Sequence, residues 1–226
     1  MRLCLRVNFP NIEEADEDGL LAIGASTDPH ILIQAYSSGI FPWPYDESEP
    51  LAWFAPNPRG VIFKKDIHFS KSLLKFIKKT SLVVKINIDF SKVIQECANV
   101  KRKNQPGTWI YKNIVSGYTE LFNMQKAYCI SVYNKNEMVG GLYGVCIGEL
   151  ISGESMFFKE DNASKLALYT LLTIVKKKNI PLLDTQMVTP IIASFGGKNI
   201  DRSEFMKELS QLDLSKKRDD TFNAYD

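Results

Sequence analysis

Cysteine and histidine are scarce: the chain has four cysteines and two histidines among its 226 residues. The cysteines stand singly, and none belongs to a C-x-x-C pair: they are Cys4, Cys97, Cys129 and Cys146. A disulfide framework and a zinc cage both require clustered ligands, so neither is indicated. We therefore expect free, buried thiols and no zinc cage.

A long apolar run and a targeting segment are also missing. No stretch reaches the roughly 18 apolar residues that a membrane span requires. The N-terminal sequence MRLCLRVNFPNIEEADEDG does not have the basic and then apolar order of a signal peptide. With 45% hydrophobic and 24% charged residues, the chain can bury a large core. We expect a globular cytoplasmic protein with no membrane partner.

The signatures of several enzyme classes are missing as well. The glycines of GGLYGVCIG, residues 140–148, are irregularly spaced inside expected strands, so they form neither a dinucleotide fingerprint nor a P-loop. Glycines inside strands more often mark the close approach of a backbone or a ligand. His30 and His68 lie far along the chain from Ser155, which argues against a Ser-His-Asp or Cys-His set.

Positive charge is concentrated after residue 50. Residues 1–50 hold two arginines against nine acidic residues, although the whole chain has a net charge of +2. The sequence KKDIHFSKSLLKFIKKT, residues 64–80, predicts a short helix capped by Ser70. Four lysines share one face of it and form what we call the lysine stripe: Lys71, Lys75, Lys78 and Lys79. The stripe fits a nucleic-acid phosphate backbone, and an ordinary solvated helix face explains it equally well.

Proline and glycine divide the chain into two parts. They recur through the first 60 residues, where only PHILIQAYSSG has helical periodicity, with Asp28 as N-cap and Gly39 as stop. From about residue 61 regular helices and strands replace this pattern. We therefore expect a small, loop-rich N-terminal domain, residues 1–62, and a larger domain, residues 63–226.

The larger part predicts a mixed sheet covered by helices. The expected helices cover residues 90–100, residues 110–126, and a segment that starts after Asn162, its N-cap, and stops before Pro181. The expected strands cover residues 81–88, 127–134, 138–148, 150–157 and 181–188. The three middle strands predict an antiparallel meander, and the last strand joins one of them in parallel by a right-handed crossover. This is an α+β fold. The polar tail, residues 215–226, is expected to fray.

Three polar side chains stand on segments that otherwise predict core strands: Glu154, Asp184 and Gln186. Asp184 and Gln186 are two residues apart, so they project from the same face of one strand. Burying such groups is costly unless they are hydrogen-bonded. They are therefore either a catalytic set or a polar network that ties strand ends to backbone amides.

The three tryptophans all fall in loop-like segments flanked by proline or glycine. They are Trp43 in GIFPWP, Trp53 in LAWFAPNPRG and Trp109 in PGTWI. An indole in a loop either covers the core or offers a face on which a base can stack. The sequence pattern leaves both interpretations open.

Six segments, in this order and spacing, closely resemble the leucyl/phenylalanyl-tRNA-protein transferases of bacteria: AYSSGIFPWP, WFAPNPRG, GTWI, VGGLYGVCIGELISGESMF, NASKLAL and LLDTQ. The resemblance runs from about residue 18 to about residue 205, and the GESMF box followed by NASK is its most specific part. It implies a small N-terminal domain, a C-terminal domain of the acetyltransferase-like fold, and a monomer without a cofactor.

The resemblance also implies a reaction. Leucine or phenylalanine, with methionine as a further candidate, passes from its charged tRNA to the N-terminal amine of a protein that begins with arginine or lysine. The modified protein is then degraded through the N-degron pathway. An aminoacyl ester is already activated, so the enzyme must orient the amine, handle its proton and stabilise the oxyanion.

By the same resemblance, Gln186 lies beside the ester carbonyl and the α-amine, and Asp184 orients it. Glu154 holds the substrate ammonium or orients Gln186, with Ser155 beside it. The remaining roles concern binding: Trp43 and Trp109 flank the terminal adenosine, Leu142 and Ile151 line the side-chain pocket, and the lysine stripe follows the tRNA backbone.

Two departures from the family pattern affect the pocket. Ala127-Tyr128-Cys129 replaces the usual A-H-S, and Ile151 replaces a common aromatic residue, so the relative use of leucine, phenylalanine and methionine stays open. One alternative is an acyl-CoA-dependent N-acetyltransferase of the same fold, but KEDNASK is a poor pyrophosphate loop. Another is a non-enzymatic module that binds single-stranded RNA, which leaves the three polar strand residues unexplained.

Overall fold

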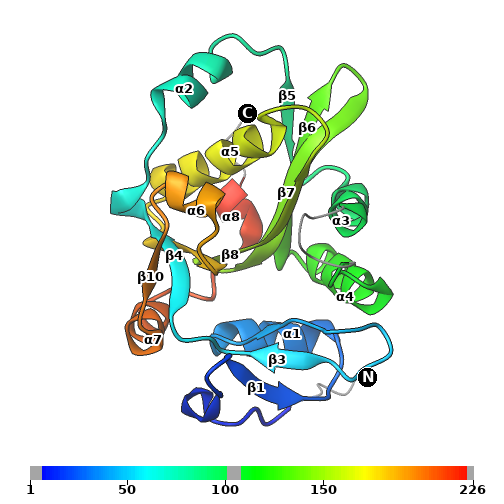
Figure 1. The fold of residues 1–226 in the computed structure, drawn as a ribbon, viewed down its shortest axis with the longest axis vertical. Helices are drawn as coiled ribbons and strands as arrows, with labels where there is room; N and C mark the ends of the chain where they lie inside the picture. The colour runs from blue at the N-terminus through cyan, green and yellow to red at the C-terminus, as the bar shows by residue number, and fades with distance from the viewer. Residues whose placement is uncertain (1–6, 101–107, 223–226) are drawn as a thin grey trace.

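The computed structural model describes residues 7–100 and 108–222, which form two β-sheets surrounded by helices (Figure 1). A three-stranded sheet lies near the N-terminus, and a seven-stranded sheet forms the centre of the molecule. Within the described residues, no helix combines the length and the apolar character needed to cross a membrane.

The small sheet is antiparallel, with the strand order β1-β3-β2. Its strands are β1 (Leu20–Ile23), β2 (Phe41–Pro42) and β3 (Ala52–Phe54); a short 3-10 helix, η1 (Ile12–Glu14), precedes them, and α1 (Pro29–Ser37) follows β1. Asp28 caps α1 as predicted, because its carboxylate accepts the backbone N–H of His30 at 2.8 Å. The three short strands were not predicted, since none is long enough to display alternation.

The large sheet has the strand order β10-β4-β9-β8-β7-β6-β5. Its strands are β4 (Arg59–Phe63), β5 (Val83–Ile86), β6 (Ala127–Asn134), β7 (Glu137–Ile147), β8 (Leu150–Phe158), β9 (Leu182–Gln186) and β10 (Lys198–Ile200). Adjacent strands are antiparallel except β8 and β9, which run parallel. The predicted meander is β6 to β8 and the predicted parallel strand is β9, so the α+β class is confirmed. The sequence pattern missed β4 and β10, which extend the sheet beyond β9.

Helices cover both faces of the large sheet. α5 (Ala163–Lys177) lies on one face, and α3 (Phe90–Asn99) and α4 (Lys112–Asn123) lie on the other (Figure 1). All three occur where they were predicted. Asn162 occupies the N-cap position of α5 as predicted, with φ +66° and without a side-chain capping bond. The remaining short helices are η2 (Lys64–Asp66), α2 (Lys71–Ile77), α6 (Pro190–Ser194), α7 (Arg202–Ser210) and α8 (Arg218–Phe222).

The structure differs from the sequence prediction at the expected domain boundary and in the C-terminal tail. The boundary expected after residue 62 falls inside β4, the first strand of the large sheet, and the division into two domains stays a prediction. The tail expected to fray instead contains α8, in which Thr221 and Phe222 are buried, so that expectation is wrong for residues 218–222. Residues 101–107 and 223–226 lie outside the described part of the chain.

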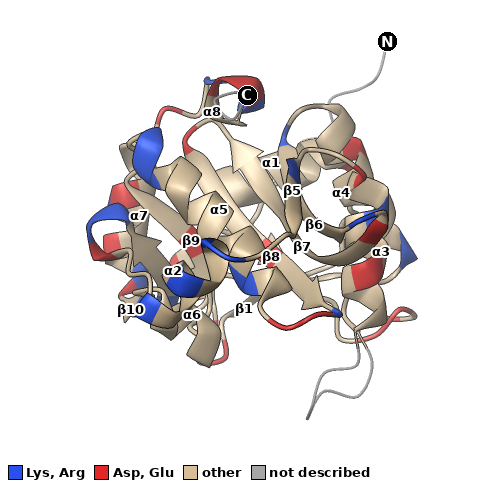
Figure 2. Ribbon diagram, turned by 90° about the horizontal axis from the view of Figure 1, so that it is seen from above, with Lys and Arg blue, Asp and Glu red and all other residues tan. Residues whose placement is uncertain are grey.

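Charged residues are rare at the centre of the fold (Figure 2). The strands β6 to β9 contain three of them, Glu137, Glu154 and Asp184. Glu137 is exposed at the start of β7. The other two are the carboxylates that the sequence pattern selected as candidate site residues.

Candidate active site

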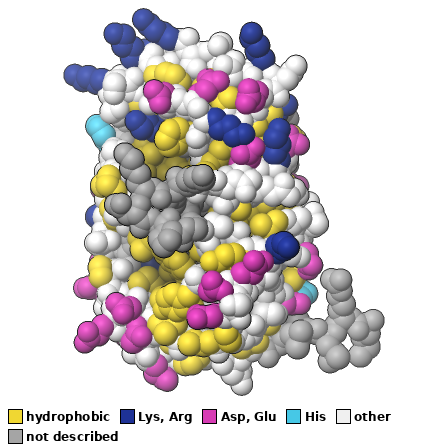
Figure 3. Space-filling model, turned by 45° about the vertical axis from the view of Figure 1, so that its right-hand side comes forward, with side chains coloured by type: hydrophobic (Ala, Val, Ile, Leu, Met, Phe, Trp, Pro, Cys, Tyr) yellow, Lys and Arg dark blue, Asp and Glu magenta, His cyan; other side chains and the backbone are white. Residues whose placement is uncertain are grey.

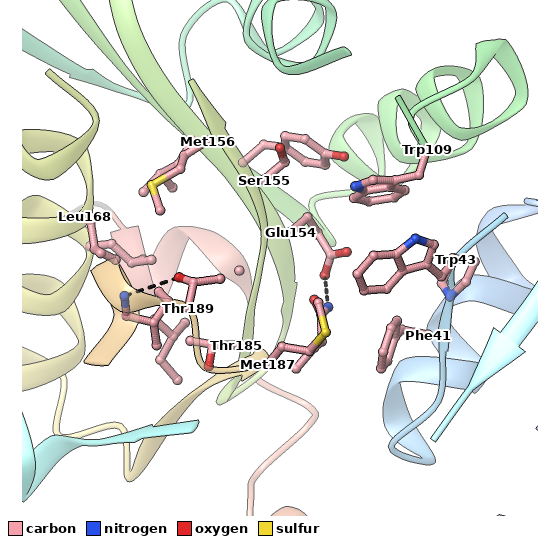
Figure 4. Close-up of a pocket in the computed structure, with 18 residues that line it drawn as sticks. Phe41, Trp43, Trp109, Glu154, Ser155, Met156, Leu168, Thr185, Met187 and Thr189 are labelled. Atoms are coloured by element: carbon pink, nitrogen blue, oxygen red, sulfur yellow. Dashed lines mark hydrogen bonds between the residues drawn. The ribbon is translucent and has the colours of Figure 1, made fainter. Parts of the chain in front are cut away.

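A cavity of about 320 Å³ opens beside the place where β8 and β9 separate (Figure 4). One wall is aromatic and contains Phe41, Trp43 and Trp109. The opposite wall is apolar and comes from the sheet, α5 and α6: Leu142, Met156, Leu168, Leu171, Leu183 and Ile192. Polar groups lie between these two walls: Glu154, Ser155, Thr185 and Gln186. The cavity is therefore divided into an apolar end, a polar centre and an aromatic end.

A β-bulge in β8 aims Glu154 into the cavity. On the neighbouring strand β7, Tyr143 pairs with Ser155 and Gly144 pairs with Gly153, so Glu154 is an extra residue without a partner. A bulge of this kind bends the strand and redirects a side chain. The ladder between β8 and β9 also ends one residue after Ile151, at the pair Ser152–Asp184. Glu154 thus stands beyond the point where the two parallel strands part.

A second irregularity shapes the end of β9. Gly60 pairs with Gln186 and Val61 pairs with Asp184, so Thr185 is the extra residue here. Gln186 itself has φ +61°, a left-handed conformation that is uncommon outside glycine and typical of functional sites. A side chain at Gly60 would place its Cβ 2.5 Å from the carbonyl carbon of Met187, so only glycine allows this approach. The two irregular strand ends bring Gln186 Nε2 to 2.8 Å from Glu154 Oε1.

Glu154 accepts several hydrogen bonds inside this network. Ser152 Oγ donates to its Oε1 at 2.9 Å, and the Tyr118 hydroxyl donates to its Oε2 at 3.3 Å. Tyr118 is in turn hydrogen-bonded to the hydroxyl of Tyr36. Burial raises the pKa of Glu154 to about 7, and the charge of Asp184 adds to this, although the hydrogen bonds oppose it. Near neutral pH this carboxyl group can therefore both accept and donate a proton.

Asp184 lies behind the cavity. It is 1% exposed and forms a two-pronged ion pair with Arg59, with Nε–Oδ1 and Nη2–Oδ2 distances of 2.9 and 2.7 Å. Its Oδ1 also accepts the backbone N–H of Gln186 at 3.0 Å. Asp184 thus holds the left-handed backbone of Gln186, whereas the side-chain amide of Gln186 donates to Ser152 and Glu154.

Arg59 also connects Asp184 and β9 to the N-terminal part of the chain. Its Nη1 donates to the carbonyl oxygen of Gly39 at 2.9 Å. The guanidinium group lies between two aromatic rings, 4.8 Å from the centre of Phe41 and 4.5 Å from that of Phe205. Phe41 also lines the cavity. Arg59 therefore supports both the aromatic wall and the strand that carries Gln186.

The three tryptophans have different surroundings. Trp43 and Trp109 both line the cavity, with ring centroids 6.1 Å apart and planes at 37° (Figure 4). Trp53 is 1% exposed, and its indole N–H donates to the Gly24 carbonyl at 2.8 Å. Trp53 is therefore a core residue, whereas the other two present indole surface to the cavity.

Some predicted binding residues reach the cavity and others do not. Leu142 and Ser155 line it. Ile151 does not: it is 1% exposed and packs in the apolar cluster between the sheet and α5, so its predicted place in the pocket wall is corrected. It lies before the strands separate, where its parallel partner Leu183 still adjoins it. Leu183 is the residue of that pair that reaches the cavity.

The lysine stripe lies away from the cavity. Its four side chains are exposed, and Ser70 caps α2 as predicted by accepting the backbone N–H of Leu73 at 3.2 Å. α2 ends at Ile77, so Lys78 and Lys79 follow the helix, which corrects the longer helix that was predicted. α2 lies at the upper end of the molecule, where Figure 3 shows projecting lysine and arginine side chains.

Sequence reasoning missed four residues of the polar network: Tyr36, Arg59, Tyr118 and Ser152. The two tyrosines sit on the apolar faces of α1 and α4 and match the pattern of ordinary core residues. Arg59 left a usable signal, because it is a charged residue followed directly by the apolar segment GVIF. Ser152 lies two residues before Glu154, directly in front of the GESMF box that was singled out.

Comparisons with known proteins point to one family. The family model of leucyl/phenylalanyl-tRNA protein transferase matches residues 61–210, and the model of its N-terminal domain matches residues 26–57. The leucyl/phenylalanyl-tRNA–protein transferase of Flavobacterium johnsoniae is 45% identical over 201 residues, which cover 89% of this chain and 94% of that protein. The protein of the same name from Vibrio parahaemolyticus is 41% identical over 217 residues, which cover 95% of this chain and 91% of that protein.

The solved structures that resemble this one are more distant. A ribosomal-protein-alanine N-acetyltransferase from Brucella melitensis aligns over 50% of this chain and 86% of its own, with 12% identity and a TM-score of 0.34. This likeness carries no argument about function. The family matches, in contrast, include every segment that lines the cavity, from Phe41 to Ile192. The chain belongs to the leucyl/phenylalanyl-tRNA protein transferase family.

Proposed function

We propose that this protein transfers leucine or phenylalanine from aminoacyl-tRNA to the N-terminal amine of a protein that begins with arginine or lysine. The observation that carries the proposal is the three-part cavity. Its apolar end fits an aliphatic or aromatic side chain, its polar centre fits an ester and an amine, and its aromatic end fits an adenine. These are the three parts of an aminoacylated 3′-terminal adenosine.

The reaction needs one proton transfer in addition to the exchange of bonds. The amine nitrogen of the acceptor attacks the ester carbonyl carbon, the new C–N bond forms, and the bond from carbon to the ribose oxygen breaks. One amine proton must leave, and the ribose oxygen must gain one. Glu154 suits both steps, because its pKa of about 7 lets it accept the proton as a carboxylate and return it as an acid.

Gln186 acts as an orienting acceptor in this proposal. Its amide nitrogen already donates to Glu154 and Ser152, at 2.8 and 3.2 Å. The amide carbonyl oxygen is then the atom that can accept a hydrogen bond from the attacking amine. Donation to the ester carbonyl, the other contact expected of Gln186, would require one of the existing bonds to be released.

Trp43 and Trp109 are proposed to flank the terminal adenosine. Their centroid distance of 6.1 Å and tilt of 37° leave no room for a base between them, so one ring must move or the base must lie along their shared surface. The lysine stripe is proposed to contact tRNA phosphates beyond the terminal nucleotide, because α2 lies apart from the aromatic wall.

The cellular consequence follows from the product. A protein whose basic first residue is extended by leucine or phenylalanine becomes a substrate of the N-degron pathway. We propose that the enzyme does this in the cytoplasm, as a monomer and without a cofactor.

A direct assay tests the proposal. Purified protein is mixed with leucyl-tRNA and a peptide that begins with arginine, and mass spectrometry follows the addition of one leucine. A peptide with N-terminal aspartate is the matched acceptor control, and acetyl-CoA in place of the charged tRNA tests the N-acetyltransferase alternative. Binding of the tRNA without any extended peptide would favour an RNA-binding module and would contradict the proposed reaction.

A further inference from the structure

The bulge that carries Glu154 is supported from behind by a tyrosine. Tyr128 on β6 is fully buried, and its hydroxyl donates to the backbone carbonyl oxygen of Ser152 at 3.2 Å. The side chain of Ser152 is hydrogen-bonded to both Glu154 and Gln186, at 2.9 and 3.2 Å. Tyr128 therefore reaches the polar network through the backbone of Ser152 and does not itself line the cavity.

A glycine makes this contact possible. A Cβ atom at Gly144 would lie 1.9 Å from the Ser152 carbonyl oxygen and 2.6 Å from the Tyr128 hydroxyl oxygen. No side chain fits there, because atoms of adjacent strands already occupy the space. Gly144 is also the register partner of Gly153, at the step where the bulge begins. Three neighbouring strands, β6, β7 and β8, thus meet tightly at the carbonyl of Ser152.

The C-terminal helix covers the other side of Tyr128. The Phe222 ring stacks on the Tyr128 ring, with centroids 4.8 Å apart and planes at 24°. Arg218 anchors α8 by donating to the carbonyl oxygens of Phe122 and Ala127, at 3.2 and 3.0 Å. α8 lies beyond residue 210, where the family match ends. Tyr128 is therefore supported by a helix that lies after the residues matched by the family model.

We propose that Tyr128, held in place by Phe222, is a positioning residue that fixes Ser152 and thereby aligns Glu154 and Gln186 for transfer. The hydroxyl satisfies a buried carbonyl oxygen at a point where the regular ladder is interrupted. Without this bond the Ser152 backbone is free to shift, and its hydroxyl shifts with it. Small displacements of catalytic groups lower rates strongly. The activity part of this inference rests on the proposed function.

The test compares two tyrosines of the same strand. Tyr128→Phe removes the hydroxyl and keeps the ring that stacks on Phe222. Tyr133→Phe is the matched control, because it removes a hydroxyl that bonds to Asp89 and lies outside the cavity lining. We expect Tyr128→Phe to slow single-turnover transfer about tenfold and to bind a non-hydrolysable aminoacyl-adenosine within about threefold of the parent. The control should transfer at the parent rate per folded molecule.

A second readout does not depend on the reaction. The ¹³C chemical shift of the Glu154 carboxyl group reports its pKa, which the Ser152 hydrogen bond lowers. Tyr128→Phe should therefore raise this pKa, whereas Tyr133→Phe should not. The other charged or titratable groups around Glu154 stay unchanged in both variants: Tyr36 on α1, Tyr118 on α4, and Asp184 on β9 with its partner Arg59 on β4.

Phe222→Leu completes the design. It should shift the rate and the Glu154 pKa in the same directions as Tyr128→Phe but by less. The double variant should be no worse than about the Tyr128→Phe single, since the two residues act along one path. If the parent transfers and Tyr128→Phe matches it in rate and in Glu154 pKa, the inference is wrong. If the parent transfers nothing, the proposed function fails, and the carboxyl titration still decides the positioning role.

Discussion

Replacing Glu154 by glutamine should make the protein more stable and less active, and the stability gain should depend on pH. The glutamine keeps the shape of the side chain and a carbonyl oxygen that can accept from Ser152 and Gln186. It removes the ionisable group whose pKa burial raises from 4.5 to about 7. A raised carboxyl pKa means that the folded protein disfavours the charged form.

The magnitude and the pH window follow from this shift. A rise of the Glu154 pKa from 4.5 to about 7 corresponds to roughly 3 kcal/mol of unfolding free energy. Below pH 4.5 the group is neutral in both states and the parent loses nothing. Between pH 4.5 and about 7 the Glu154 carboxyl group is ionised in the unfolded chain but still protonated in the folded protein, so the parent loses stability as pH rises. Above about pH 7 the loss is constant. Glu154→Gln should therefore match the parent near pH 4 and exceed it by up to about 3 kcal/mol at pH 8.

Urea unfolding from pH 4 to pH 8.5 measures this difference, and single-turnover transfer on the same samples measures activity. The parent rate should rise through pH 7 and then level off, whereas the variant should be roughly 10²-fold slower and should lack this pH dependence. Glu149→Gln is the control of opposite sign, because a hydrogen bond from Lys216 lowers the pKa of Glu149, so its carboxylate contributes stability at pH 8. A variant that is no more stable than the parent at pH 8, or that keeps the pH–rate profile, would refute the assigned environment and role.

Further predictions address binding, donor choice and the buried ion pair. Trp109→Ala should weaken a minimal aminoacyl-adenosine analogue by roughly 1–3 kcal/mol, whereas reversing the lysine stripe to glutamate should weaken full-length tRNA alone; titration calorimetry with both ligands decides. Leucine, methionine and phenylalanine esters should transfer and isoleucine and valine esters should not, because a branch at Cβ meets the apolar wall; equal transfer of valine and leucine in a competition assay would contradict this. Gln186→Ala should bind the analogue like the parent and transfer roughly 10²-fold more slowly, and undiminished turnover of the folded variant would exclude its assigned role. Arg59→Met should cost roughly 3–5 kcal/mol of unfolding free energy by leaving Asp184 buried without its partner, whereas the Arg59→Met/Asp184→Leu pair should cost much less; equal losses in chemical unfolding would argue against the pair as the cause.

The elements that sequence predicts well here are those specified by local chemistry. Asp28 and Pro29 mark the start of α1, and the meander has strands long enough for a clear pattern. Glu154, Asp184 and Gln186 could be selected because each interrupts an apolar strand. The contacts among them could not be predicted, because they depend on which strand pairs with which and in what register. A bulge is a property of two strands together, so the pairs around Glu154 and Thr185 leave no mark in either strand alone.

Contacts between residues far apart in the chain, and the burial of the C-terminal helix, could not be predicted from the sequence for a similar reason. Arg59 lies 125 residues from Asp184 in the chain, and nothing local identifies the carboxylate that it meets. Tyr36 and Tyr118 are 82 residues apart and meet only because α1 packs against α4. The composition of α8 is polar, and Phe222 is a core residue because it packs into the apolar cluster that includes Tyr128.

The irregular backbone and the reactivity of the site have one physical origin. In a regular β-ladder, Glu154 would point to the face opposite that of the residues before and after it in β8. β9 would also stay paired with β8, so no cavity would form between the two strands. The bulges at Glu154 and Thr185 interrupt the side-chain alternation and the pairing of β8 with β9 at the same level of the sheet. The strands separate there, and Glu154 and Gln186 turn toward each other. The result leaves a carboxyl group with a raised pKa and a glutamine with a left-handed backbone, both of which oppose folding. The Arg59–Asp184 pair restrains the Gln186 backbone from one side, and Tyr128 restrains Ser152 from the other. The strained conformation is thereby kept in the free protein, so the network need not be assembled when substrate arrives.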